Sequence, residues 1–281
     1  MFDVSHPDVR AAVQRALAED IGAGDVTSAL TVGADLQASG VFVAKENFVA
    51  AGIELLPLIY EMRGGAKFST KASSGDRMQK GDVFASVYGR ARTLLECERV
   101  SLNFLQRLSG VATSASRYAA AVAGTRTRVL DTRKTTPGLR RLEKMAAAAG
   151  GAVNHRFGLF DAVLIKNNHI TAAGGVRQAL SAALGYDGTI EIEVRTRAEL
   201  EEALASGAKH LLLDNLTPAQ ASEWIRHIDG RATVELSGGI TLESIRQYAE
   251  AGPDFISVGA ITHSAVAVDI SFRLELERSC P

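Results

Sequence analysis

Cysteine, proline and long apolar runs are all scarce in this chain of 281 residues. Two cysteines, Cys97 and Cys280, cannot build a disulfide framework, so we expect a reduced, cytoplasmic setting. No basic segment followed by an apolar run opens the sequence, and no apolar stretch approaches the ~20 residues that cross a bilayer. We therefore expect neither a signal peptide nor a membrane span.

An excess of positive charge is also missing. The chain has 31 Lys and Arg against 32 Asp and Glu, for a formal net charge of −1. A protein that coats nucleic acid usually carries a basic excess, so we expect no nucleic-acid partner. Any anion site must then be a local concentration of cations. With 46% hydrophobic residues, the chain can form one large domain or two modest ones with real cores.

The first third of the chain has the pattern of a mixed α+β unit. Residues 8–20 and 54–62 are predicted to be helical. Over residues 67–89, two Gly-Asp turn signals, at 75–76 and 81–82, separate short β-like runs. A helical pattern then covers residues 93–123. Its polar face carries Glu96, Arg99, Asn103 and Arg107, a pattern that is typical of a solvated surface.

After residue 126 the chain alternates six short β-type runs with helical runs, which predicts a parallel sheet covered by helices. The units are short and even, and no GxGxxG follows the first strand, so a (β/α) barrel is favoured over an open doubly wound sheet. Six units are too few for a complete barrel of eight. The barrel is therefore incomplete, or one strand is hidden near residues 110–126.

Polar residues gather where these predicted strands end, and in parallel α/β folds that edge carries the active site. The strand ends in order are Asp131-Thr132-Arg133-Lys134, Lys166-Asn167-Asn168-His169, Glu191 and Glu193, Asp214-Asn215, Ser237-Gly238-Gly239, and Ser257-Val258-Gly259-Ala260, with Asn154-His155-Arg156 just ahead of the second strand. We expect a site for a substrate with several negative charges, at least one of them a phosphate.

Three local patterns suggest how anions would be held. Thr136 is predicted to cap a helix that begins at Pro137, aiming free N–H groups where Arg133 and Lys134 lie. The turns at 237–239 and 257–260 contain glycine and bring backbone N–H groups close to a phosphate.

The roles of several single residues stay open at this level. Lys166 is either a Schiff-base nucleophile, as in aldolases, or a cation for a substrate carboxylate. Glu193 and Asp214 suit Mg²⁺, sugar hydroxyls, a developing positive charge or salt bridges to Arg133 and Lys134. Glu191 shares the strand face of Glu193, deeper in the barrel. His155 is a general acid or an ordinary hydrogen-bonding residue.

Taken together, the motifs resemble one family, the quinolinate phosphoribosyltransferases, which are the decarboxylating nicotinate-nucleotide pyrophosphorylases. The segments that carry the resemblance are AEDIGAGDVTS, ERVSLNFLQRLSGVAT, LDTRKTTPGLRRLEK, GGAVNHR, LIKNNHI, EIEV, LLLDN, ELSGGI and SVGAITHS, in this order along nearly the whole chain.

The resemblance implies an N-terminal α/β sandwich domain over residues 1–110 and an incomplete, seven-stranded α/β barrel over 111–265, with a C-terminal helix at about 266–281 that packs back on the first domain. It implies a reaction of quinolinate with phosphoribosyl pyrophosphate that gives nicotinate mononucleotide, pyrophosphate and CO₂, with Mg²⁺ and without an organic cofactor. That reaction belongs to de novo NAD synthesis.

The same resemblance implies roles for individual residues. Lys134, Lys166, Glu193 and Asp214 would be catalytic, and Glu193 and Asp214 would also hold Mg²⁺, directly or through water. The implied substrate-binding residues are Arg99, Thr132, Arg133, Lys134, His155, Arg156, Lys166, Glu193, Asp214, Ser237, Gly238, Gly239, Ser257, Val258, Gly259 and Ala260. The family also implies a homodimer in which Arg99 of one subunit completes the site of the other.

The chain departs from the family pattern at Asn167, where Asp is usual. This change removes one negative charge beside Lys166 and leaves the metal environment open. Leu236 and the alanines at 146–149 also differ, at structural positions. The alternatives are a molybdenum-transport-associated paralogue of the same fold, which typically loses the NHR and LIKxNHI segments present here, a Schiff-base aldolase that uses Lys166, and a protein that only binds phosphometabolites.

Overall fold

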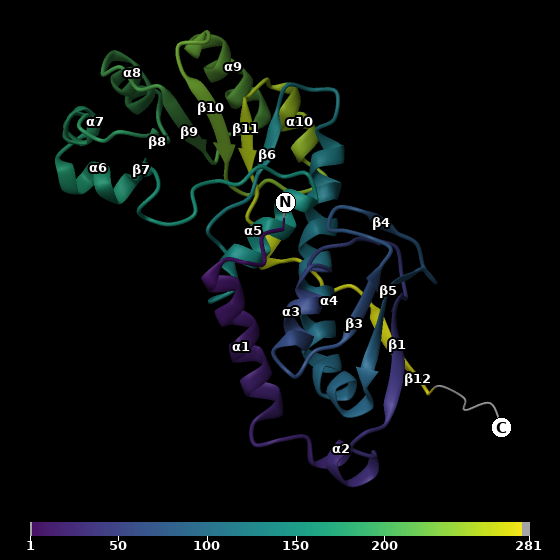
Figure 1. Ribbon diagram of the computed structural model, residues 1–281. Coiled ribbons are helices and arrows are strands. Elements are labelled where there is room, and N and C mark those ends of the chain that lie inside the picture. Colours follow the sequence, from purple (N-terminus) through teal and green to yellow (C-terminus); the bar gives the residue numbers. More distant parts are fainter. Residues whose placement is uncertain (1, 277–281) are drawn as a thin grey trace. The chain divides into compact units, whose positions relative to one another are not determined.

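The computed structural model describes residues 2–276, and the chain divides into two compact units (Figure 1). The first unit contains the chain up to Ser116, Thr135–Gly151 and the segment from Thr262 onward; the second contains Arg117–Lys134 and Ala152–Ile261. The predicted boundary after residue 110 would assign 111–116, 135–151 and 262–265 to the barrel, whereas by packing they belong with the first unit.

The first unit is built on a four-stranded antiparallel sheet with the order β12-β1-β5-β3. Its strands are β1 (Gln37–Ala44), β3 (Lys67–Thr70), β5 (Val83–Arg90) and β12 (Ile270–Leu276), and a separate pair is formed by β2 (Phe48–Val49) and β4 (Arg77–Met78). Its helices are α1 (Pro7–Ile21), α2 (Val26–Thr31), α3 (Leu55–Glu61), α5 (Arg140–Ala149) and the larger part of α4 (Ala91–Ala121). The helices predicted at 8–20, 54–62 and 93–123 are thereby confirmed.

Aromatic packing fixes the register of this sheet. The ring of Phe42 on β1 lies 5.0 Å from that of Phe272 on β12 and 6.3 Å from that of Phe84 on β5. Phe272 also covers Gly40, where an added Cβ would come within 2.1 Å of the ring. The missing side chain at Gly40 therefore leaves room for the ring of Phe272 where β12 pairs with β1.

The prediction of a helix over residues 266–281 is wrong. Residues Ile270–Leu276 form β12, which pairs antiparallel with β1 from Ala38↔Leu276 to Ala44↔Ile270. Apolar residues at every second position, Ile270, Phe272 and Leu274, have the period of a strand rather than of a helix. Residues 277–281, including Cys280, lie outside the described part of the chain.

The second unit is a parallel six-stranded sheet with the order β6-β11-β10-β9-β8-β7. Its strands are β6 (Arg128–Leu130), β7 (Val163–Ile165), β8 (Ile190–Val194), β9 (His210–Asp214), β10 (Thr233–Ser237) and β11 (Phe255–Ser257), joined by helices α6 (Asn167–Ala173), α7 (Val176–Ala183), α8 (Arg197–Ala205), α9 (Pro218–Ile228) and α10 (Ile245–Glu250). The short helix α11 (Ala260–His263) follows β11.

A parallel bridge between Leu130 and Val153 extends this sheet beyond β6. Pairing therefore runs from Val153 through β6, β11, β10, β9 and β8 to β7, and all the pairs are parallel. With Val153 as a one-residue seventh member, the sheet is the incomplete barrel that the sequence predicts. The strand proposed near residues 110–126 does not form, because α4 extends to Ala121. Within residues 2–276, no helix is long and apolar enough to span a bilayer.

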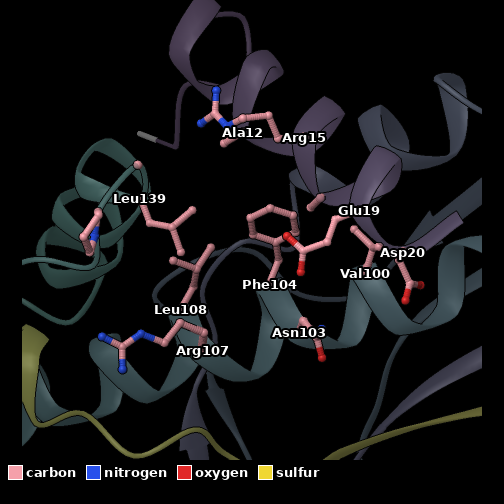
Figure 2. Close-up of a pocket in the computed structure, with 13 residues that line it drawn as sticks. Ala12, Arg15, Glu19, Asp20, Val100, Asn103, Phe104, Arg107, Leu108 and Leu139 are labelled. Atoms are coloured by element: carbon pink, nitrogen blue, oxygen red, sulfur yellow. The ribbon is translucent and has the colours of Figure 1, made fainter. Parts of the chain in front are cut away.

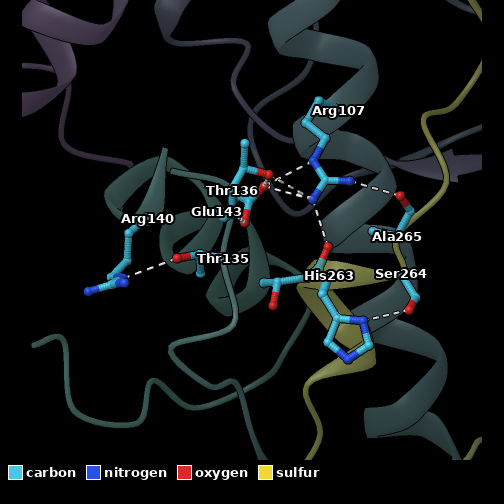
Figure 3. Close-up of polar contacts among 9 residues, drawn as sticks. Arg107, Thr135, Thr136, Arg140, Glu143, His263, Ser264 and Ala265 are labelled. Carbon is cyan, nitrogen blue, oxygen red and sulfur yellow. Dashed lines mark hydrogen bonds and ion pairs between the residues drawn. The ribbon is translucent and has the colours of Figure 1, made fainter. Parts of the chain in front are cut away.

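The solvated role expected for the polar face of α4 is wrong at Arg107. Its guanidinium donates to Oε1 of Glu143 at 2.7 Å and to the carbonyl oxygens of Thr262 at 2.6 Å and Ala265 at 2.8 Å (Figure 3). The side chain of Glu143 is fully buried and also accepts from the backbone N–H and the hydroxyl of Thr136. One buried ion pair thus joins α4, α5, residue 136 and the segment that leads to β12.

We expect Arg107→Ala to lower the free energy of unfolding by about 3–5 kcal/mol, because it leaves a buried carboxylate without its cation. A matched control is Arg10→Ala, which breaks an exposed pair with Glu61 at 3.8 Å and is expected to change stability by less than about 1 kcal/mol. Urea denaturation of both variants measures the difference. Equal, small effects would show that the Arg107–Glu143 pair contributes little to the fold.

Candidate active site

The polar residues singled out in the sequence lie at one edge of the barrel sheet. Lys166 follows β7, Glu193 lies near the end of β8, and Asp214 is the last residue of β9. Ser237 and Ser257 are the last residues of β10 and β11. Since Ser237 is the Cα partner of Asp214 in the ladder, and parallel strands end on the same side, the structure brings these groups to one edge.

The turn after β10 can be made only with glycine at position 238. Gly238 has φ +104°, and an added Cβ would come within 2.8 Å of the backbone nitrogen of Asn215, the residue that follows β9. Asn215 itself adopts a positive φ of 58°. The turns after β9 and β10 therefore approach each other as closely as backbone allows, and a larger residue at 238 would force them apart.

The turn after β11 is tied to the neighbouring strand. The backbone N–H of Val258 donates to the carbonyl of Leu130 at 3.0 Å, and the side chains of Ser257 and Val258 are buried. Gly259 and Ala260 are only partly exposed, and α11 begins at Ala260. The two glycine turns thus follow adjacent strands, since β10 pairs with β11.

Glu193 and Asp214 are joined by an arginine that the sequence analysis did not single out. Arg195 donates to Oε1 of Glu193 at 2.7 Å, and its Nε lies 3.6 Å from Oδ2 of Asp214. Salt bridges to Arg133 or Lys134 had been the expected alternative for these carboxylates. The signal for Arg195 was present, because it continues the same-face alternation of Glu191 and Glu193.

The two carboxylates offer the hard oxygen donors that Mg²⁺ prefers. Glu193 is 6% exposed, so its carboxylate is well shielded, and Oδ2 of Asp214 also accepts from the side-chain amide of Asn215 at 2.8 Å. These two carboxylates fit Mg²⁺ as ligands, but the guanidinium of Arg195 already neutralises part of their negative charge. This arrangement favours a cation held through water over one held by many direct ligands.

Two arginines, Arg133 and Arg156, follow the bridged residues Leu130 and Val153 at this edge. Burial lowers the pKa of Arg156, and the positive charge of Arg133 lowers it further. Nη1 of Arg156 donates to the carbonyl of Ala162 at 3.1 Å, whereas its buried Nε has no hydrogen-bond partner. The carboxylates of Asp161 and Glu191 offset part of this repulsion between like charges, and an anion bound beside the two arginines would offset more of it.

The predicted cap at Thr136 is wrong. Pro137 and Gly138 form a turn, Gly138 has φ +79°, and α5 begins at Arg140 without a side-chain cap. The hydroxyl of Thr136 instead donates to Glu143. Arg133 and Lys134 therefore do not share a site with a helix that starts at Pro137; Lys134 is exposed, and its backbone N–H donates to Oγ1 of Thr132.

His155 lies between two carboxylates. Its Nε2 is 3.5 Å from Oε2 of Glu191 and 3.4 Å from Oε2 of Glu235, and its Nδ1 accepts from the backbone N–H of Arg156 at 2.7 Å. Burial opposes protonation of His155, but hydrogen bonds to the two carboxylates outweigh it and raise its pKa to about 9. Burial also raises the pKa of Glu191.

In the neutral imidazole Nδ1 accepts a hydrogen bond from the N–H of Arg156, so the ring proton lies on Nε2, between the two carboxylates. Three such side chains could also ligate a metal ion. Metal binding would need a bare Nε2, whereas this hydrogen-bond pattern puts a proton there.

Lys166 is exposed and precedes α6. Its backbone N–H donates to Nδ1 of His169 at 2.9 Å, which holds the turn that presents the lysine. A Schiff-base lysine is normally activated by desolvation in a hydrophobic pocket or by a neighbouring cation. The exposure of Lys166 favours a carboxylate-binding cation over an imine-forming amine.

Asn167, the departure from the family pattern, is the half-buried first residue of α6. We expect Asn167→Asp to change activity less than about threefold and to alter the Mg²⁺ dependence only slightly, because the substitution is nearly isosteric and keeps an acceptor oxygen. Mg²⁺ titrations of the rate for both proteins test this expectation. A rise of tenfold or more, about 1.4 kcal/mol of barrier, would show that Asn167 impairs the site and would revive the paralogue alternative.

Arg99 is the one predicted site residue outside the barrel unit. It is exposed on α4, in the part of the helix that belongs to the first unit. Its neighbour Glu96, the partner that an isolated helix would supply, is instead bound by Arg63 at 2.8 Å. The structure therefore groups all the other predicted residues in one unit and leaves Arg99 in the other.

A cleft of about 350 Å³ opens in the first unit between α1, α4 and residues 137–139 (Figure 2). Phe104, Leu108 and Leu139 line it with apolar surface, and Arg15 and Glu19 add charge. None of the residues that line the cleft is among the polar residues at the barrel strand ends. The residues that we expect to bind phosphate and carboxylate lie at the barrel edge, so the cleft is not the candidate active site.

Comparison with known proteins gives matches over nearly the whole chain. The family models described as the N-terminal and C-terminal domains of quinolinate phosphoribosyl transferase match residues 25–109 and 111–273. The chain is 40% identical to a decarboxylating quinolinate phosphoribosyltransferase of Nicotiana tabacum, over 97% of this chain and 85% of that protein. It is 38% identical to a probable nicotinate-nucleotide pyrophosphorylase of Bacillus subtilis, over 97% and 96%.

Solved structures agree with these matches. The NadC structure from Streptococcus pyogenes superposes with a TM-score of 0.92 at 37% identity, covering 95% of this chain and 96% of that one. The nicotinate-nucleotide pyrophosphorylase of Francisella tularensis gives a TM-score of 0.90 at 34% identity, with 96% and 98% covered.

Proposed function

The chain belongs to the quinolinate phosphoribosyltransferase family, the decarboxylating nicotinate-nucleotide pyrophosphorylases of NAD biosynthesis, and we propose how its own residues carry out that reaction. The observation that carries the proposal is the presence in one unit of two carboxylates, Glu193 and Asp214, and of three cations that follow barrel strands or the bridge at Val153, namely Arg133, Arg156 and Lys166. A dianionic pyridine and a sugar that develops positive charge need these two opposite environments together.

Quinolinate has two adjacent carboxylates, and we assign them to Arg133, Arg156 and Lys166, with His155 as a supporting residue. Bidentate guanidinium–carboxylate contacts fix the plane of a flat ring. The unpaired Nε of Arg156 supports this assignment. Arg99 would contribute one more cation, and Thr132 its hydroxyl.

Phosphoribosyl pyrophosphate carries a 5′-phosphate and a pyrophosphate. We assign the phosphate to the turns Ser237–Gly239 and Ser257–Ala260, where Gly238 allows close backbone approach. Lys134 would bind the leaving pyrophosphate. Mg²⁺ near Glu193 and Asp214 would supply charge neutralisation for the pyrophosphate.

The first chemical step joins the pyridine nitrogen to C1 of the ribose while the bond from C1 to pyrophosphate breaks. Positive charge develops on the ribose ring and negative charge on the leaving group. Fixed carboxylates at Glu193 and Asp214 stabilise the first, and Lys134 stabilises the second, because both are in place before charge develops.

The second step needs no nucleophile from the protein. The nucleotide formed in the first step contains a cationic pyridinium ring, which accepts the electron pair of the bond to the departing 2-carboxylate. CO₂ leaves, and the carbon takes up a proton to give nicotinate mononucleotide. Lys166 therefore serves as a carboxylate clamp and forms no imine.

We further propose a homodimer in which Arg99 reaches the barrel of the partner subunit. Arg99 belongs to the first unit and the other predicted site residues belong to the second, and this division supports the arrangement. We propose a cytoplasmic location on the basis of the buried, unpaired thiol of Cys97. Some plant relatives are named as chloroplastic or mitochondrial, so fractionation with a tagged chain is the direct check.

One assay separates this function from the two other classes. The protein is mixed with quinolinate, phosphoribosyl pyrophosphate and Mg²⁺, and pyrophosphate and nicotinate mononucleotide are measured together. We expect both products in equal amounts. A protein that only binds phosphometabolites would release no pyrophosphate, and an aldolase would give a borohydride-trapped adduct on Lys166 with a carbonyl substrate.

Lys166→Ala is expected to weaken quinolinate binding at least about tenfold, the effect of losing one charge-assisted contact of about 1.5 kcal/mol or more, and to lower kcat. Binding of phosphoribosyl pyrophosphate should stay within about twofold, since its phosphate is assigned to other strand ends. Calorimetric titration with each substrate alone measures the split. An equal loss for both substrates would contradict the assignment of Lys166 to quinolinate.

A further inference from the structure

Glu235 is a buried charged residue for which the proposed mechanism has no use. It occupies the middle of β10, its side chain is 4% exposed, and its Oε1 has no hydrogen-bond partner. A barrel interior is usually more stable with an apolar residue at such a position, because burying a carboxylate carries a large desolvation penalty. Its presence therefore calls for a role other than stability.

The contacts of Glu235 lead to a single side chain, His155. Its Oε2 lies 3.4 Å from Nε2 of His155, and Oε2 of Glu191 lies 3.5 Å from the same atom. Two acceptors from strands β8 and β10 thus converge on one nitrogen. They select the tautomer that carries a proton on Nε2, and they leave Nδ1 as an acceptor.

The other nitrogen of the ring reaches the backbone of the next residue. The N–H of Arg156 donates to Nδ1 at 2.7 Å, and the N–H of His155 itself donates to Oδ1 of Asp131 at 2.9 Å. The backbone at 155–156 is therefore fixed through one imidazole on one side and one carboxylate on the other. If the ring turned over, Cδ2–H would face the N–H of Arg156 and Cε1–H would face the two carboxylates, so both sets of contacts would be lost.

Arg156 is the residue that this arrangement orients. Its guanidinium is held at one end by the carbonyl of Ala162 at 3.1 Å, and it lies beside the like charge of Arg133. A cation pair of this kind has an intrinsic tendency to separate. The backbone at 156 must be rigid if the two guanidinium groups are to meet one substrate at a fixed spacing.

We propose that Glu235 is a positioning residue: by accepting from Nε2–H of His155, together with Glu191, it fixes the imidazole that holds Arg156 in place for a planar aromatic dicarboxylate. The inference rests on the proposed function only in assigning Arg156 to quinolinate. Glu235 touches no substrate in this account and acts through His155 alone.

Two substitutions separate positioning from a merely structural role. Glu235→Leu has nearly the same volume and removes the acceptor, whereas Glu235→Gln keeps an acceptor oxygen at the same reach. We expect Leu to raise KM for quinolinate at least tenfold, with KM for phosphoribosyl pyrophosphate within twofold and with unfolding temperature equal to or above that of the wild type. We expect Gln to stay within about threefold of the wild type for both substrates.

A folded Glu235→Leu protein with unchanged KM for quinolinate would overturn the proposal, and so would equal rises in KM for both substrates. The control is the single variant Glu223→Leu, which removes an exposed carboxylate from α9. The wild type is assayed first. If it does not use quinolinate, the proposed function is wrong, and this result is distinct from any effect of the Glu235 variants.

The tautomer provides a test that needs neither activity nor a stable variant. The wild-type protein, labelled with ¹⁵N in its six histidines, is examined by NMR, and His155 is assigned from the signal lost in His155→Gln. The spectra are recorded above pH 9, where the imidazole is neutral, and we expect an unprotonated Nδ1 and a protonated Nε2. A neutral ring with its proton on Nδ1, the opposite tautomer, would overturn the proposal.

Discussion

Replacing Arg133 or Lys134 with alanine is expected to lower kcat/KM by about 10- to 150-fold while leaving thermal stability unchanged. Each substitution removes a charge-assisted contact to an anion, which is worth about 1.5–3 kcal/mol. Both residues follow β6 at the edge of the barrel and are partly or fully exposed, so neither substitution opens a cavity in the core.

Lys209→Ala is the matched control for this pair. Lys209 is exposed in the same unit and immediately precedes β9, so it lies at the opposite edge of the sheet from Asp214. We expect it to keep wild-type kcat/KM. If Arg133→Ala or Lys134→Ala retained near-normal kcat/KM, or if Lys209→Ala lost as much activity, the anion site would not lie where we assign it.

Co-expression of Arg99→Ala and Lys166→Ala chains is expected to restore about one quarter of wild-type activity from two weakly active proteins. In a two-fold symmetric dimer with shared sites, random pairing makes half of the dimers mixed, and each mixed dimer has one site with both lesions and one with none. The physical basis is the position of Arg99, which lies in a different unit from every other predicted site residue.

The control mixture combines Lys134→Ala with Lys166→Ala. Both lesions fall in the barrel unit, so every site in every mixed dimer keeps one lesion and no activity should return. Mass spectrometry of the intact dimers confirms that mixed species form. No recovery in the Arg99 mixture, with mixed dimers present, would show that Arg99 serves its own chain and that the sites are not shared.

Much of the barrel could be predicted because its signals are local. Several parallel strands are short apolar runs followed by a polar residue, as in Val163–Ile165 before Lys166 and Leu211–Leu213 before Asp214. Such a run predicts where the strand lies, and the polar residue after it predicts which side chain is found at the carboxyl edge of the sheet. Family resemblance then added what the pattern could not, namely the reaction and the role of each residue.

The errors arose where distant partners decide local structure. Thr136 and Pro137 have the sequence of a helix start, yet Glu143 captures the hydroxyl of Thr136 because Arg107 holds that carboxylate in place. Residues 270–276 became a strand because β1 offers an unpaired edge. Sequence periodicity reports propensity, and such tertiary contacts override it.

The interior carboxylate at 235 and the arginine at 195 show a different limit. Both occupy positions whose face on the strand is readable from alternation, yet their importance depends on His155, Glu193 and Asp214 being within reach. Contacts among three separate strand ends are not encoded in any one segment. Only the assembled barrel shows which of its charged residues touch one another.

The most direct test of the central claim follows the carbon that leaves. Quinolinate labelled in its 2-carboxylate is incubated with the protein, phosphoribosyl pyrophosphate and Mg²⁺, and labelled CO₂ is collected alongside pyrophosphate and nicotinate mononucleotide. We predict that the three products appear in equal amounts and that omission of phosphoribosyl pyrophosphate abolishes CO₂ release, because only the pyridinium nucleotide can accept the electrons of the departing carboxylate. Release of labelled CO₂ without the co-substrate, or pyrophosphate release with the label retained in the nucleotide, would contradict the account.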